Sequence, residues 1–106
     1  MVAVEHLQEL AELCGGAQEM PEGGKTYIHL TSVQVAAGIR VPALLCMQEH
    51  SGYSTRLFLP QAVPGRGANW TTHHILGRTW YSWSWQGVPA NLRPAEILAA
   101  HLRPLR

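Results

Sequence analysis

The sequence contains no aspartate and only one lysine, and charged residues make up 14% of its 106 positions. No apolar run approaches the roughly 20 residues that a membrane-spanning helix needs. The N-terminus lacks the basic start and the apolar core of a signal peptide. Two cysteines, Cys14 and Cys46, are too few for a disulfide framework. These absences predict a cytoplasmic protein with free thiols and no membrane segment.

Hydrophobic residues are plentiful, at 46% of the sequence, and the length suits one domain over residues 1–106. The charges are divided along the chain, because residues 1–24 hold five glutamates and no basic residue. The arginines that follow are scattered singly, whereas nucleic-acid-binding proteins usually present a clustered basic face. We therefore expect no nucleic-acid partner. The sparse charge indicates instead that a partner covers part of the surface.

Apolar residues recur at helical spacing near both ends of the chain. Gly15-Gly16 ends the first helix, and Pro94 suits the first turn of the second, where a missing N–H costs nothing. Apolar stretches joined by short turns lie between them and predict consecutive antiparallel strands. The expected elements are a helix over 4–14, strands over 25–35, 39–48 and 53–59, a fourth strand over 70–76 or 79–85, and a helix over 94–102. This order predicts an α+β fold, with an antiparallel four-stranded meander and both helices on one face.

An aromatic stretch stands out in the last third of the chain, where three of the four tryptophans fall within six residues. From Tyr81 to Trp85, aromatic residues alternate with serines, so Tyr81, Trp83 and Trp85 should share one face of a strand. Aromatic stripes on strands more often belong to a core than to a ligand platform. Rings that stay exposed would be anchors for a protein partner.

No motif identifies an enzyme. The six histidines lack metal-binding spacing, and the neighbours His73 and His74 would point to opposite faces of a strand. A metal could be assembled only from distant residues such as His29, His50 and His73, and we expect no metal and no cofactor. Arg66 and Arg78 flank the histidine pair, which indicates either an anion-binding patch or a solvated loop surface.

Cys46 could act as a nucleophile if a histidine served as its base. However, it lies in the most apolar run of the chain, residues 43–47. Burial among apolar groups raises the pKa of a thiol and keeps it inert. The pattern therefore favours a structural role for Cys46.

The element order resembles that of ubiquitin-conjugating enzymes and their relatives, the RWD domains. Local motifs are also similar, although each is degenerate. The stretch from Tyr53 to Pro60, with Pro64 beyond it, resembles the family's Tyr-Pro segment and proline-flanked third strand. Further similar segments are His73-His74-Ile75 in place of His-Pro-Asn, Gly77-Arg78-Thr79-Trp80-Tyr81 in place of the active-site segment, and Trp85 with Val88-Pro89-Ala90 before the last helix. The resemblance implies a ubiquitin-conjugating-like fold over residues 4–102.

The main departure from that family concerns its chemistry. Trp80 stands where the thioester cysteine should be, and a tryptophan cannot form a thioester. The resemblance therefore implies a non-catalytic relative, with Cys46 as the fallback nucleophile. The expected binding surface consists of the aromatic strand and the neighbouring loop, with Arg66, His73, His74, Arg78, Trp80, Trp83 and Trp85.

The chain is similar, in particular, to small bacterial proteins of the prokaryotic ubiquitin-conjugating-like families. Their resemblance implies two partners, a ubiquitin-like protein and an activating-type adenylyltransferase, and a role in antiviral defence. Two alternatives come from other classes. One is a small protein-binding or assembly domain, such as a homodimer, unrelated to ubiquitin; the other is a histidine-based metalloenzyme.

Overall fold

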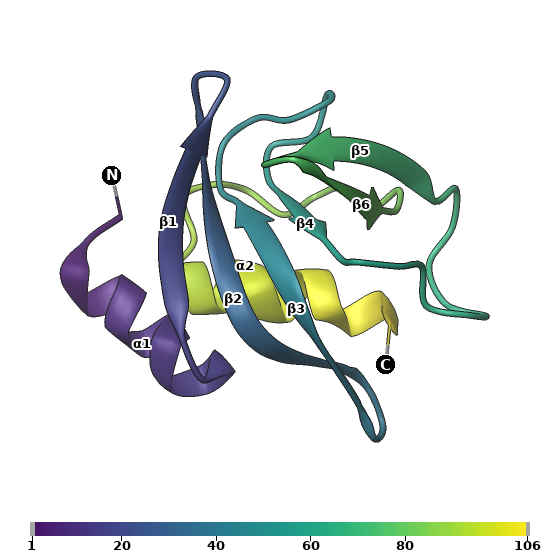
Figure 1. Cartoon of the computed structure of the whole chain (residues 1–106), viewed down its shortest axis with the longest axis horizontal. Helices are drawn as coiled ribbons and strands as arrows, with labels where there is room; N and C mark the ends of the chain where they lie inside the picture. Colours follow the sequence, from purple (N-terminus) through teal and green to yellow (C-terminus); the bar gives the residue numbers. More distant parts are fainter. Residues whose placement is uncertain (1, 106) are drawn as a thin grey trace.

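The computed structural model describes residues 2–105, which form two helices, six strands and a short 3-10 turn (Figure 1). A four-stranded antiparallel sheet has the order β1-β2-β3-β4, and β5 and β6 form a separate antiparallel hairpin. The elements are α1 (Val4–Cys14), β1 (Ala17–Glu22), β2 (Lys25–Ala36), β3 (Ile39–Cys46), β4 (Arg56–Phe58), β5 (Thr71–Ile75), β6 (Arg78–Ser82), α2 (Pro94–Leu102) and η1 (Arg103–Leu105). The predicted α+β class, with a four-stranded antiparallel sheet and a helix near each end, is confirmed.

Both helices pack on the same face of the sheet, which we call the helix face (Figure 1). Gly15 ends α1 in the left-handed conformation, with φ of 71°, which glycine adopts without steric cost. Pro94 begins α2, and the predicted apolar stripe of α2 is buried. The main core lies between the helices and the sheet and includes Leu10, Leu30, Leu45, Leu57, Ile97 and Leu102.

The β5–β6 hairpin covers part of the opposite face of the sheet, which we call the hairpin face (Figure 1). A second, smaller core lies beneath the hairpin and contains Tyr27, Leu44, Cys46, Phe58, Ile75 and Trp80. One pair of backbone hydrogen bonds, between Leu59 and Tyr81, connects the hairpin to the end of β4. Because Leu44 and Leu45 are both fully buried, β3 has the two buried faces that its continuous apolar run predicts.

Three strand predictions differ from the structure. The segment around Met20 forms the edge strand β1 rather than only a turn. The fourth strand of the sheet is therefore β1, whereas 70–76 and 79–85 correspond to the two strands of the hairpin. The aromatic strand ends at Ser82, and the Ser82 side chain faces inward, where its hydroxyl donates to the Leu57 carbonyl at 2.7 Å.

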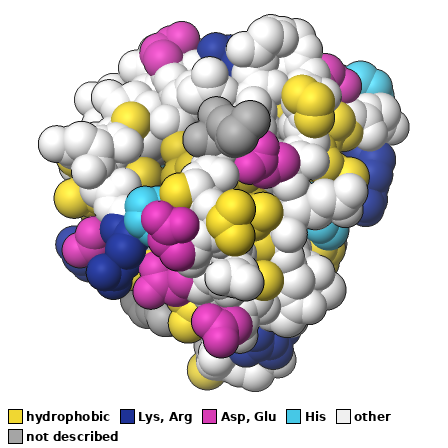
Figure 2. Space-filling view, turned by 90° about the vertical axis from the view of Figure 1, so that its left-hand side faces the viewer, with side chains coloured by type: hydrophobic (Ala, Val, Ile, Leu, Met, Phe, Trp, Pro, Cys, Tyr) yellow, Lys and Arg dark blue, Asp and Glu magenta, His cyan; other side chains and the backbone are white. Residues whose placement is uncertain are grey.

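The surface around α1 and β1 is acidic (Figure 2). Acidic side chains gather there among hydrophobic ones, and they come from a segment without any basic residue. Exposed apolar side chains on α1 include Val4 and Leu13, which are 70% and 58% exposed. Within residues 2–105, neither helix has the length and apolar character needed to cross a membrane.

Candidate functional site

Both thiols are enclosed by the protein. Cys46 ends β3 on the hairpin face and is fully buried, and Cys14 is buried at the end of α1. Burial raises the pKa of the Cys46 thiol, and it also raises the pKa of Cys14. A buried thiol with a raised pKa is a weak nucleophile. Cys46 therefore acts as a packing residue of the smaller core in this structure.

Trp80 fills the centre of the smaller core and is 2% exposed. Its indole Nε1 donates to the Ile75 carbonyl at 3.2 Å, which ties β6 to β5. The guanidinium of Arg78 lies 5.4 Å from the ring centre, and the ring of His29 in β2 approaches it edge-on. A partner cannot contact the Trp80 ring in this arrangement, because the ring is a structural element of the hairpin face.

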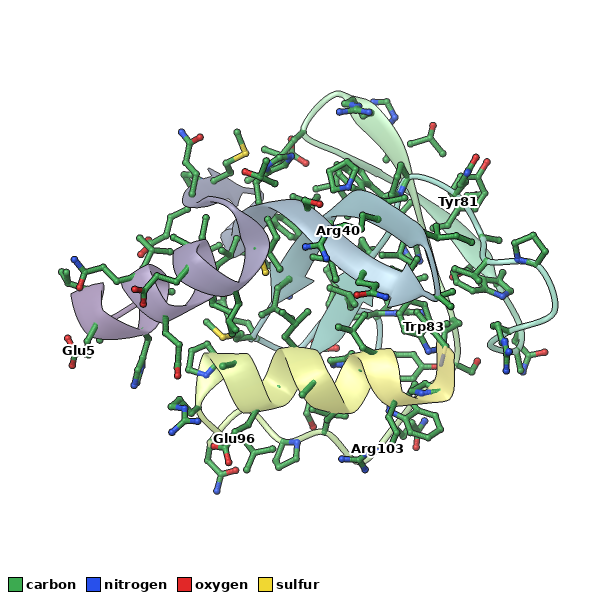
Figure 3. The ribbon with its side chains drawn as sticks, turned by 90° about the horizontal axis from the view of Figure 1, so that it is seen from below. Glu5, Arg40, Tyr81, Trp83, Glu96 and Arg103 are labelled. Atoms are coloured by element: carbon green, nitrogen blue, oxygen red, sulfur yellow. The ribbon has the colours of Figure 1, made fainter. Side chains whose placement is uncertain are left out.

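The other two tryptophans of the aromatic stretch pack toward the helix face. Trp83 is buried and lies near the C-terminal end of α2 (Figure 3). Its ring packs against Trp70, with 5.0 Å between ring centres, and edge-on against His101. Trp85 is half-buried, and its Nε1 donates to the Ala100 carbonyl at 3.0 Å. Trp83 therefore belongs to the core, as the sequence pattern favours for aromatic residues of this stretch.

The remaining predicted surface residues lie on the hairpin and on the loop before it. Arg66 is exposed in the loop, and its carbonyl accepts a hydrogen bond from Trp70 Nε1 at 2.8 Å. His74 and Arg78 are exposed on β5 and β6. His73 points inward and is half-buried. Adjacent strand residues thus face opposite sides, as their period predicts.

His73 also belongs to a cluster with Arg56 that the sequence did not predict. This histidine–arginine cluster comprises Tyr27, His50, Arg56, Thr71 and His73. The sheet register aligns Tyr27 with Cys46 and Cys46 with Arg56, so Tyr27 and Arg56 share the hairpin face. The rings of His50 and His73 are 5.7 Å apart between centres. The cluster therefore joins three strands and the turn after β3.

Arg56 is the central cation of the cluster and is only 4% exposed. Its Nε donates to Ser82 Oγ at 3.0 Å, and its Nη2 donates to Thr71 Oγ1 at 3.4 Å. The guanidinium also lies 4.2 Å from the centre of the Tyr53 ring, which attracts a cation through its quadrupole. Within residues 2–105, no carboxylate forms an ion pair with Arg56. Neutral groups therefore hold a buried charge.

Hydroxyl groups hold the two histidines of the cluster. His50 Nε2 lies 3.1 Å from Tyr27 Oη, and His50 Nδ1 lies 2.8 Å from Ser51 Oγ. His73 Nε2 lies 2.8 Å from Thr71 Oγ1. Burial lowers the pKa of His50, and His73 and nearby cations lower it further. Burial, followed by the charge of Arg56, also lowers the pKa of His73.

One more buried histidine lies on the helix face. His101 is 2% exposed, and its Nε2 donates at 2.8 Å to Thr55 Oγ1, since that hydroxyl donates its own proton to the Val88 carbonyl at 2.8 Å. Burial, with a contribution from Arg56, lowers the pKa of His101 to about 4. His101 is therefore neutral at pH 7 and joins α2 to the start of β4.

Across residues 2–105, no group of three or more His, Cys, Asp or Glu side chains is arranged to hold a metal ion. Comparisons with protein-family models, curated proteins and solved structures find no match to this chain.

Proposed function

We propose that this protein is a protein-binding domain of ubiquitin-conjugating-like architecture, acting in a bacterial ubiquitin-like conjugation pathway without a thioester cysteine of its own. It binds a ubiquitin-like protein or the activating-type adenylyltransferase that supplies it, in the setting of antiviral defence. The observation that carries the proposal is at Trp80. At the position that resembles the catalytic one, the side chain is an enclosed tryptophan, and Cys14 and Cys46 are also buried.

The arrangement of elements supports this architecture. A helix precedes a four-stranded meander, a further segment folds over the sheet, and a helix closes the chain. The resemblance drawn from the sequence implies the same order. Fold similarity alone does not establish activity, so the proposal assigns binding and leaves transfer of the modifier to another protein.

The charge distribution supports a particular binding surface. Residues 50–95 contain four arginines and no acidic residue. Arg66, His74 and Arg78 are exposed within this segment, and we assign them to the contact surface. This basic surface favours an acidic surface on the partner, since complementary charges speed association and select partners.

Co-purification of the chain expressed with its native gene neighbourhood tests the proposal, followed by a non-reducing gel with ATP to detect a bound ubiquitin-like protein. We expect a complex that thiol reductant does not change and that Cys46→Ala retains. Arg66→Glu with Arg78→Glu should weaken the complex at least tenfold. Arg103→Glu is the matched control, because Arg103 lies on the exposed side of the helix layer (Figure 3), and it should leave the affinity of the complex unchanged.

Two results would contradict the proposal. An adduct that thiol reductant cleaves would establish a working thioester cysteine. The absence of any complex with either partner would remove the link to ubiquitin-like conjugation.

Exposed apolar residues of α1 favour a second candidate function, a small assembly domain that forms homodimers. Val4 and Leu13 are largely exposed, although helix geometry places them on opposite flanks of the buried stripe of α1, and exposed apolar side chains are common at interfaces. Light scattering coupled to size-exclusion chromatography distinguishes the two. A dimer that Leu13→Glu converts to a monomer would support assembly, and a monomer at all concentrations would count against it.

A further inference from the structure

The histidine–arginine cluster holds more positive charge than its surroundings balance. Removing a guanidinium from water is costly unless an opposite charge or a full set of hydrogen bonds compensates for it. Arg56 has hydroxyl and ring partners only, and its Nη1 has no acceptor among residues 2–105. The only fully enclosed side-chain polar atom without a partner in that range is Trp83 Nε1, so Arg56 Nη1 is not fully enclosed and keeps a small contact with solvent.

Two carboxylates act on groups of the cluster, Glu49 on His50 and Glu22 on Tyr27, and both have other partners. Glu49 accepts from the Gly52 N–H at 2.7 Å and lies 3.7 Å from Lys25 Nζ. Glu22 accepts from the Leu76 N–H at 2.9 and 3.0 Å. The other titratable side chains near the two histidines include Tyr27 and Lys25, and neither carries a negative charge at neutral pH. The cluster therefore has no internal anion to offset Arg56.

The hydrogen bonds of the cluster also leave one ring nitrogen of His73 without a partner. Thr71 Oγ1 accepts from Arg56 Nη2 and lies 2.8 Å from His73 Nε2, so one hydroxyl joins the arginine to the histidine. The other ring nitrogen, His73 Nδ1, has no hydrogen-bond partner among residues 2–105. Arg56 Nη1 and the Nδ1–H of a protonated His73 ring are therefore donors that no group among residues 2–105 accepts. A tetrahedral oxyanion accepts several charge-assisted hydrogen bonds of this kind at once.

We propose that Arg56 and His73, with His50 beside them, bind a tetrahedral oxyanion, the phosphate or sulfate group of a small ligand. Arg56 supplies the fixed charge, and Thr71 orients both donors. Protonation of either histidine adds a positive charge next to the anion, so binding tightens as the pH falls. The proposal is independent of the ubiquitin-like pathway, because it concerns the partly covered hairpin face rather than the exposed arginines.

Calorimetric titration of the whole chain with inorganic sulfate tests the site, at constant ionic strength set by chloride. Sulfate keeps its charge across the range used, so any pH dependence comes from the protein. We expect saturable binding of one sulfate that tightens at least fivefold between pH 8 and pH 6. Arg56→Gln should abolish it, and His73→Gln should weaken it at least threefold and flatten its pH dependence.

Arg78→Gln is the matched control, because it removes one exposed arginine from the neighbouring strand and should leave sulfate binding unchanged. If Arg56→Gln does not fold, the ring signals of the histidines in the unaltered protein supply the answer by NMR. The His50 and His73 signals should move with sulfate while that of His74 stays. Equal effects of sulfate and chloride, equal loss of sulfate binding in Arg78→Gln, or movement of the His74 signal alone would overturn the proposal.

The same titration with inorganic phosphate defines the ligand class. Phosphate binding that the same substitutions weaken would show that the site accepts tetrahedral oxyanions in general. Sulfate binding without phosphate binding would restrict the ligand to sulfate groups.

Discussion

Lowering the pH should destabilise this protein through His101. In the folded state, burial lowers the pKa of His101 to about 4 from its ordinary value of 6.5. The unfolded chain therefore binds a proton at a pH where the folded protein does not, and stability falls as the pH drops below 6.5. The contribution is fully present above pH 6.5 and is lost down to about pH 4.

The size of the effect follows from the gap between the two pKa values. At about 1.36 kcal/mol per pH unit, the full loss is about 3 kcal/mol, of which about 2 kcal/mol is lost by pH 5. This is a large share of the roughly 5–15 kcal/mol that stabilises a small domain. Urea denaturation at half-unit steps from pH 7.5 to pH 4.5 measures the free energy of unfolding along this range.

His101→Gln separates this cause from others. The glutamine amide can donate to Thr55 Oγ1 as His101 Nε2 does, but it does not titrate. We expect the variant to lose about 2 kcal/mol less than the unaltered protein between pH 7 and pH 5. His50 and His73 add a slope of the same sign, because burial also lowers the pKa of each.

Two observations would refute this reasoning. The first is a pH profile of His101→Gln that coincides with that of the unaltered protein, while the exposed control His74→Gln behaves the same way. The second is direct titration of the folded protein by NMR. If the His101 ring took up its proton near pH 6.5, burial would not hold it neutral.

Three further predictions concern the fold. Trp80→Ala should lower the free energy of unfolding by about 3–5 kcal/mol, measured in urea, because it empties the smaller core. Gly16→Ala should also lower the free energy of unfolding, because φ of Gly16 is 148° and the added Cβ would overlap the Thr31 hydroxyl. Adding Thr31→Ala to that variant should recover part of the lost stability. No recovery would mean that the backbone angle alone causes the loss. Cys14 and Cys46 should react with an aromatic disulfide reagent at least a hundredfold faster in denaturant than in the native protein, and fast native labelling would contradict their burial.

Local patterns in the sequence predicted the parts of the fold that local physics determines. Gly15 predicts where α1 ends and Pro94 predicts where α2 begins, because their backbone preferences need no tertiary information. The strand β1 escaped prediction because Pro21 and its neighbouring glutamate are weak strand formers. An edge strand tolerates them, and only the fold reveals that this segment lies at an edge.

The candidate site depended on information that the sequence does not display. Arg56 and Tyr27 come together through the register of three strands, which no spacing along the chain encodes. A signal did exist, because Arg56 directly precedes the apolar run Leu57-Phe58-Leu59 in the predicted strand. The aromatic alternation was misleading for a related reason. Ser82 is buried to bind Arg56, so the expected polar side of that strand faces inward.

The two helices that cover the main core are separated by most of the chain, yet they pack against each other, and Arg93 Nε lies 3.2 Å from Glu9 Oε1. During synthesis, the four strands of the sheet emerge long before α2. Their apolar helix face, including Leu45 and Leu57, is covered in part by α1 and is completed only when α2 packs on it. Exposed apolar strands are prone to aggregate. The nascent chain therefore exposes an aggregation-prone surface until α2 is available to cover it.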